Sequence, residues 1–193
     1  MIKEENIIRY YVLCNKLKDV IRTGWKDFKV TRERVESVAE HIYGVQMLAI
    51  SMYSEFNYDI DIYKVIFMLA VHELEEIVIG DLTPFQITEE DKMKIGHDAI
   101  SKVLNNLNMK ESIEKLILEF DDRKTKEAKF AYQCDKLEAD LQCKLYDEEN
   151  CVKEENWSNK WLINSKKRHN FDNNFESVLD YALNNEINDI QKR

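Results

Sequence analysis

Apolar side chains recur along most of the chain at steps of three and four residues, the spacing of one face of an α-helix. Alternating strand-like stretches are almost absent. We expect helices over about residues 4–20, 32–55, 60–79, 90–107, 110–121 and 125–149, with further packing helices in about 155–193. This pattern predicts an all-α fold, in which the apolar faces of the helices form the core of a bundle.

Three of the expected helices present continuous apolar stripes. The stripe of the first is formed by Ile7, Ile8, Tyr11, Leu17 and Val20. The stripe of the second is formed by Val35, Val38, Ile42, Val45, Ala49 and Met52. The stripe of the third is formed by Ile62, Val65, Ile66 and Leu69. We therefore expect these faces to point into the core.

Polar residues interrupt the buried faces at a few positions. His41 lies one turn after Val38 and belongs to the buried side of its helix. The same steps that place Ile62 to Leu69 inward lead on to His72, Glu73 and Glu76, so we expect these residues in the middle of one helix where an apolar face turns polar. Asp135 flanks the stripe of the helix over 125–149.

The composition suits long helices in one domain. Of the 193 residues, 44% are hydrophobic and 34% charged, and only 4 glycines and 1 proline interrupt the chain. This length is enough for one well-buried core and short for two, and no segment has the composition of a linker. We expect a single domain over residues 1–193. Its tail, around Trp161, Phe171, Phe175, Val178 and Leu179, offers packing residues and no chemistry.

Charge and hydropathy exclude several classes of function. The net charge of −9 repels nucleic-acid backbones, which disfavours duplex binding but not a small phosphorylated ligand. The longest apolar run, residues 65–71, is far shorter than the roughly 20 residues of a membrane span, so we expect a cytoplasmic protein. The four cysteines show no CxxC spacing, and we expect them as reduced thiols: Cys14, Cys134, Cys143 and Cys151.

One set of side chains has the chemistry of a metal site. Two imidazoles and two carboxylates on three helices suit Mn, Fe, Co, Ni or Zn: His41, His72, Glu73 and Asp135. The residues alone leave simpler interpretations open. A single histidine on a core face is commonly a hydrogen-bonded structural residue, and the run HELEE at 72–76 is also compatible with a solvated helix face.

Four ordered segments carry a resemblance to a known family. They are LKDVIRTGW at 17–25, RVESVAEH at 34–41, VHELEEIVIGDLTP at 71–84 and EAKFAYQCDKLEADLQ at 127–142. In this order they resemble HD-domain metal-dependent phosphohydrolases of the 5′-deoxynucleotidase-like subfamily, over about residues 10–145. The resemblance implies an HD-domain helical bundle with a metal site between helices.

The resemblance also implies roles for individual residues. It assigns one divalent ion (Mn, Co, Fe, Ni, Zn or Mg) to His41, His72, Glu73 and Asp135. It assigns catalysis, through the attacking water and the leaving oxygen, to Glu76 and Asp81. It assigns substrate binding to Arg22 and Trp25, although packing in the core or a turn explains Trp25 equally well. The implied assembly is a homodimer.

The implied reaction is hydrolysis of nucleoside or deoxynucleoside 5′-monophosphates to nucleoside and phosphate. Glu73 departs from the family, because the second residue of its HD pair is an aspartate one methylene shorter. A metal-bound nucleotide sensor with a weakened catalytic site is therefore the alternative. Chemistry with two metal ions is disfavoured, since only His97 and His169 remain and both lie outside the matching segments.

Overall fold

The structure is a computed structural model that describes residues 2–83, 86–152 and 170–189. In these residues the only strand-like pairing is an isolated bridge between Ile21 and Ser37. The helices are α1 (Lys3–Asn15), the 3₁₀ helix η1 (Lys16–Lys18), α2 (Thr23–Asp27), α3 (Val38–Phe56), α4 (Ile62–Val71), α5 (Glu76–Ile79), α6 (Glu89–Val103), α7 (Lys110–Asp122), α8 (Lys126–Glu148) and α10 (Asn173–Asn184). This confirms the all-α prediction.

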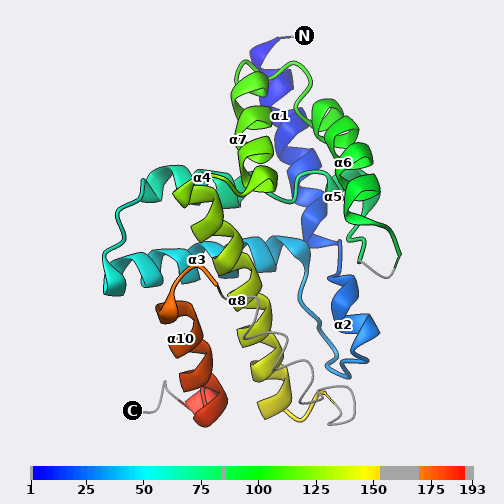
Figure 1. The fold of residues 1–193 in the computed structure, drawn as a ribbon. Helices are drawn as coiled ribbons and strands as arrows, with labels where there is room; N and C mark the ends of the chain where they lie inside the picture. Colours follow the sequence, from blue (N-terminus) through cyan, green and yellow to red (C-terminus); the bar gives the residue numbers. More distant parts are fainter. Residues whose placement is uncertain (1, 84–85, 153–169, 190–193) are drawn as a thin grey trace.

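Helix α8 is the central element of the fold (Figure 1). Helices α3 and α4 pack on α8 and on each other, and α7 and α10 also contact α8. Helices α1, α6 and α7 stand together at one end of the molecule, while α2 and α10 lie on opposite sides of α8 toward the other end. The three most closely packed helices, α3, α4 and α8, carry the candidate site.

Two hydrophobic clusters meet along α4. The first joins α3, α4, α8 and α10 and includes Val45, Met52, Val65, Leu69, Phe130, Leu137, Phe175 and Leu179. The second lies between the end of α4 and helices α6 and α7, and consists of Val71, Leu74, Ile100, Leu104, Ile113 and Ile117. Residue 72 therefore follows α4 directly at the boundary between the two clusters.

The prediction of one continuous helix over 60–79 is wrong, because the helix is interrupted in its middle. Helix α4 ends at Val71, residues 72–75 form turns, and a separate one-turn helix, α5, follows. His72 Nδ1 donates to the carbonyl oxygen of Leu69 at 2.8 Å, an acceptor that a continuous helix would offer to the Glu73 amide. Backbone bonds of the 3₁₀ type then carry the chain through Leu74. Periodicity did not reveal the break because no glycine or proline marks it.

The expected apolar stripe of the first helix is also partly wrong. Ile7, Ile8 and Tyr11 are more than 60% exposed. Helix α1 instead contacts the second hydrophobic cluster through Tyr10 and Cys14 and stops at residue 15. These two residues lie on a neighbouring face of the same helix, so hydrophobicity alone selected the wrong side.

The sequence did not predict the short helix α2. The other expected helices agree with the structure within a few residues at each end, except at the start of α3. That helix begins at Val38 rather than near residue 32, because Ser37 and Glu40 form a capping box. Ser37 Oγ accepts from the Glu40 amide, and the Glu40 carboxylate accepts from the Ser37 amide at 2.9 Å. The cap fixes the start of the helix that carries His41.

The expected tail is described only in part. Phe175 and Leu179 of α10 are buried against α8, as the sequence predicted for this segment. Trp161 and His169 lie outside the described residues. Among the residues that are described, we find no helix with the length and apolarity needed to cross a membrane.

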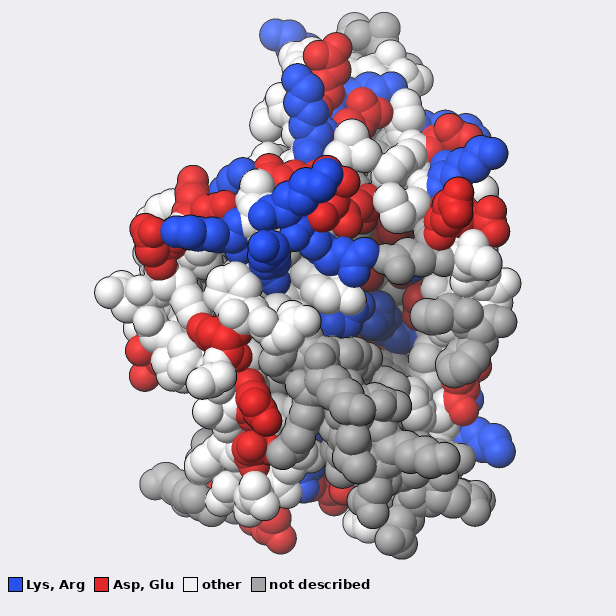
Figure 2. Space-filling view, viewed as in Figure 1, with Lys and Arg blue, Asp and Glu red and all other residues white. Residues whose placement is uncertain are grey.

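Charge is distributed unevenly over the surface. Figure 2 shows Lys and Arg side chains gathered across the middle of one face, where α7 meets α8, and beside a hollow next to it. Acidic side chains are spread around this region. Basic side chains are therefore concentrated locally on a chain whose net charge is −9.

We expect Ser37→Ala to lower the free energy of unfolding by about 1 kcal/mol, because it leaves a first-turn amide of α3 without its acceptor. Urea unfolding followed by circular dichroism measures the change. Ser51→Ala is the matched control, since that hydroxyl is exposed on the same helix and donates only to the Leu48 carbonyl. Equal stability of the two variants would contradict a capping role.

Candidate metal-binding site

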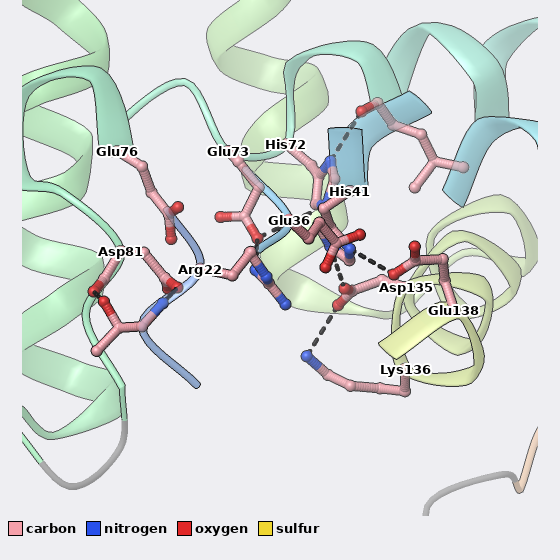
Figure 3. Close-up of polar contacts among 12 residues, drawn as sticks. Arg22, Glu36, His41, His72, Glu73, Glu76, Asp81, Asp135, Lys136 and Glu138 are labelled. Atoms are coloured by element: carbon pink, nitrogen blue, oxygen red, sulfur yellow. Dashed lines mark hydrogen bonds and ion pairs between the residues drawn. The ribbon is translucent and has the colours of Figure 1, made fainter. Parts of the chain in front are cut away.

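Four side chains from three segments converge beside α8 (Figure 3). His41 comes from α3, His72 and Glu73 from the turn after α4, and Asp135 from α8. Each offers one donor atom, and these four atoms lie within 4.8 Å of one another. The structure thus brings together the four residues that the sequence singled out as metal ligands, and the longer Glu73 side chain still reaches the group.

His72 has one ring nitrogen that is available to bind a metal ion. Its Nδ1 donates to the Leu69 carbonyl, so in the neutral ring Nε2 carries the lone pair. That Nε2 is buried and has no hydrogen-bond partner among the described residues. Burial lowers the pKa of His72 and favours the neutral ring. An unpaired buried acceptor is costly unless it binds something, and a metal ion fits this position.

The two carboxylates of the cluster are held in the ionised form. Burial opposes their charge, but nearby cations outweigh it. His72, which is protonated at the low pH where Glu73 titrates, lowers the pKa of Glu73 together with Lys92 and Arg22 to about 2, and the Arg22 Nη1 atom lies 3.6 Å from Glu73 Oε1. Lys136 and His41 keep the pKa of Asp135 well below its usual value, with Lys136 Nζ 2.8 Å from Oδ2.

His41 lies fully buried between two carboxylates. Its Nε2 is 3.0 Å from Asp135 Oδ1, and its Nδ1 is 2.6 Å from Glu138 Oε2. Burial and Arg22 oppose a positive ring, but Glu138 and Asp135 outweigh them and raise the pKa of His41 to about 9. A metal ion at Nε2 would take the place of one of the two protons.

The donor set fits a divalent metal ion. Two imidazole nitrogens and two ionised carboxylate oxygens suit a borderline ion such as Mn, Fe, Co, Ni or Zn. The unpaired Nε2 of His72 lies within this group, which is the observation on which the fit rests. Figure 3 shows the four side chains pointing toward one another rather than outward.

Glu76 is the most deeply buried carboxylate beside the cluster. Its Oε1 lies 3.0 Å from Lys92 Nζ of α6, and its Oε2 has no hydrogen-bond partner within the described part of the chain. Burial and the charge of Glu73 raise the pKa of Glu76 well above its usual value. The carboxyl is therefore disposed to hold or exchange a proton.

Asp81 lies next to Glu76, on the side of Glu73 away from His41 (Figure 3). Its Oδ2 accepts from the backbone amide of Thr23, and its carbonyl oxygen accepts from the Thr23 hydroxyl at 2.7 Å. These bonds tie the loop after α5 to the residue that follows Arg22. The backbone next to Arg22 is therefore tied to this loop.

Trp25 faces the interior. Its indole N–H donates to Glu36 Oε2 at 2.8 Å, and its ring meets Tyr146 edge to face with centroids 5.2 Å apart. Only 4% of the residue is exposed. This environment favours the packing role that the sequence left open for Trp25 over contact with substrate.

Four further charged residues around the site were missed by sequence reasoning: Glu36, Lys92, Lys136 and Glu138. Glu138 could have been predicted from the sequence, because it follows Asp135 by three residues and so lies on the same face of α8. Lys92 could not have been predicted in this way, because its approach to Glu76 depends on how α6 packs against α5.

Comparisons with known proteins point to one family. The sequence profile of the HD domain family matches residues 14–178. The chain is 35% identical over 152 residues to 5′-deoxynucleotidase HDDC2 of Dictyostelium discoideum, covering 75% of this chain and 79% of that one. It is 28% identical to human 5′-deoxynucleotidase HDDC2, covering 74% and 69%.

Solved structures show the same fold. The crystal structure of protein PH0347 from Pyrococcus horikoshii matches with a TM-score of 0.71 and 25% identity, covering 91% of this chain and 97% of that one. A protein from Magnetospirillum magnetotacticum, described as a predicted metal-dependent phosphohydrolase, matches with a TM-score of 0.74 and 20% identity over 94% and 91%. With its sequence profile, its relatives and its fold in agreement, the chain belongs to the HD domain family.

Proposed function

We propose that this protein is a metal-dependent 5′-deoxynucleotidase that hydrolyses deoxynucleoside 5′-monophosphates to deoxynucleoside and phosphate. The observation that carries the proposal is the buried group of two imidazoles and two carboxylates with the unpaired Nε2 of His72. The substrate class is supported by relatives from several eukaryotes that are named 5′-deoxynucleotidases. The metal ligands in this proposal are His41, His72, Glu73 and Asp135.

Hydrolysis of a phosphate monoester is very slow without charge stabilisation and an activated water. A divalent ion at the four ligands would supply both, by neutralising phosphate oxygens and making a water more acidic. Arg22 is the protein cation that we assign to the phosphate, because its guanidinium lies beside Glu73 with 18% of its side chain exposed. An arginine can hold two phosphate oxygens through parallel hydrogen bonds.

Two carboxyl groups are available for proton transfer. In the proposed reaction a water oxygen attacks phosphorus while the bond to the 5′ oxygen breaks. Glu76 orients the attacking water and, when ionised, receives its proton through the unpaired Oε2, while Asp81 is the proton donor to the departing 5′ oxygen; exchange of these protons with solvent restores both carboxyl groups. Because Asp81 also binds Thr23, it has a second role in holding the segment that carries Arg22.

The proposal predicts about one divalent ion per chain and release of phosphate from deoxynucleoside 5′-monophosphates. Elemental analysis and a phosphate-release screen with Mn, Co, Ni, Mg and Zn test it. Deoxynucleoside 3′-monophosphates and ribonucleoside 5′-monophosphates are the controls for position and sugar. A protein that binds one metal ion but releases no phosphate with any of these metals would instead be a nucleotide sensor.

Glu73→Ala should weaken metal binding at least roughly tenfold, about 1.4 kcal/mol, because it removes one of two anionic donors. Glu73→Asp should preserve binding, since a carboxylate remains at this position. Isothermal titration of metal into the metal-free proteins measures both, with the exposed Glu90→Ala as control. Unchanged metal affinity in Glu73→Ala would remove Glu73 from the ligand set and favour the sensor.

Glu76→Gln and Asp81→Asn should keep their metal and lose about 100-fold or more in kcat, since neither residue is a metal ligand in this proposal. Steady-state kinetics on the best substrate, beside metal analysis of each variant, provides the test. If Asp81→Asn raises KM with kcat unchanged, Asp81 acts only by holding the segment of Arg22. Wild-type kcat in Glu76→Gln would contradict its role in proton transfer.

A further inference from the structure

A second carboxylate approaches His41 from the side away from the metal cluster. Glu138 of α8 places Oε2 2.6 Å from His41 Nδ1, and only 10% of its side chain is exposed. The other ring nitrogen, Nε2, faces Asp135. A neutral imidazole carries a single proton, so the nitrogen that binds a metal is free only if the other nitrogen holds the proton.

The space occupied by Glu138 depends on a glycine in the neighbouring helix. Gly44 lies in α3 three residues after His41, one turn along the helix. A Cβ atom at position 44 would come within 2.5 Å of Glu138 Oε1 and 3.2 Å of its Cδ. Glycine inside a helix is unfavourable by about 1 kcal/mol relative to alanine. The close approach of the Glu138 carboxylate gives a reason for this glycine that is independent of the metal ligands.

The other groups that face the Glu138 carboxylate are also buried. Glu36 lies within 4.8 Å of it and of His41. Glu36 is itself fixed, because its Oε2 accepts from the Trp25 indole and its amide donates to the Tyr146 hydroxyl at 3.0 Å. The Glu138 carboxylate therefore lies between His41, to which it is hydrogen-bonded, and a Glu36 side chain that is itself held in place.

We propose that Glu138 is a positioning residue for the metal site: it holds the proton of His41 on Nδ1 and so presents Nε2 to the ion, in space that Gly44 leaves open. The inference rests on the proposed metal site. A carboxylate behind a metal-binding histidine fixes the ring orientation and increases the basicity of the ligand nitrogen. Loss of such a partner typically weakens metal binding by about 10- to 100-fold.

Titration of Co²⁺ into the metal-free full-length chain tests the proposal. Glu138→Ala should weaken Co²⁺ binding about 10- to 100-fold and change the visible absorption spectrum of the bound ion. Glu138→Gln keeps a hydrogen-bond acceptor and should bind with intermediate affinity. Glu148→Gln is the matched control, because this carboxylate lies on the same helix, is also 10% exposed and serves Lys144 and the Ile187 amide away from the site.

Gly44→Ala provides a second variant that leaves Glu138 itself unchanged. Because the added methyl must displace the carboxylate, it should weaken Co²⁺ binding even if alanine stabilises the helix. Imidazole ¹H–¹⁵N spectra of the Zn²⁺-loaded protein give a readout besides affinity. They should show His41 protonated at Nδ1 in the wild type, and in Glu138→Ala this proton should change its chemical shift and exchange faster with water, because it has lost its acceptor.

The outcomes separate this inference from the proposed function. If the wild type binds one Co²⁺ and folded Glu138→Ala and Gly44→Ala bind it equally well with unchanged imidazole spectra, the positioning role is overturned and the metal site stands. If Glu138→Ala does not fold, Glu138→Gln and Gly44→Ala decide in the same way. If the wild type binds no Co²⁺, the proposed metal site and this inference both fail.

Discussion

The burial of ionisable side chains between α3, α4 and α8 is the constraint on which the rest of the structure depends. His41, Glu73 and Asp135 bring charge into a part of the molecule that is largely closed to water, which is costly unless each charge has a partner. Arg22 and Lys136 supply partners for the two carboxylates, and Glu138 supplies one for His41. His72 Nε2 has no hydrogen-bond partner in the described region, and Glu73 Oε1 lies 3.7 Å from it, so this atom is the donor that remains available to a cation.

The two hydrophobic clusters explain why the polar group can persist there. Leu69 lies in one cluster, and Val71 and Leu74 lie in the other, so the chain around His72 is held from both sides. The ring of Phe120 also lies edge to face with the His72 ring, with centroids 5.1 Å apart. The helix can break at this point because the apolar packing on both sides fixes the turn, and the break lets Glu73 and Glu76 both face the site.

The cations around the site contrast with the net negative charge of the whole chain. The chain as a whole is acidic, but the carboxylates of the site are matched by Arg22, Lys92 and Lys136 from three different segments. These cations have partly exposed side chains, so they are placed to receive an anionic substrate as well as to stabilise the carboxylates. The same arrangement is consistent with a small phosphorylated ligand rather than a nucleic-acid duplex, which the net charge of −9 would repel.

The sequence by itself determined the helical class and most helix positions, because helical periodicity is a local property. It singled out four candidate donor residues, but their roles rested on the resemblance to a known family, since the residues alone left simpler interpretations open. It did not determine the break after Val71, since a side-chain hydrogen bond from His72 ends the helix without a glycine or proline. It also selected the wrong face of α1. Only the tertiary structure decided which partner each charge has: Lys92 for Glu76, Glu138 for His41 and the Trp25 indole for Glu36. Such pairings join residues whose distance apart depends on helix packing, and no spacing along the chain encodes them.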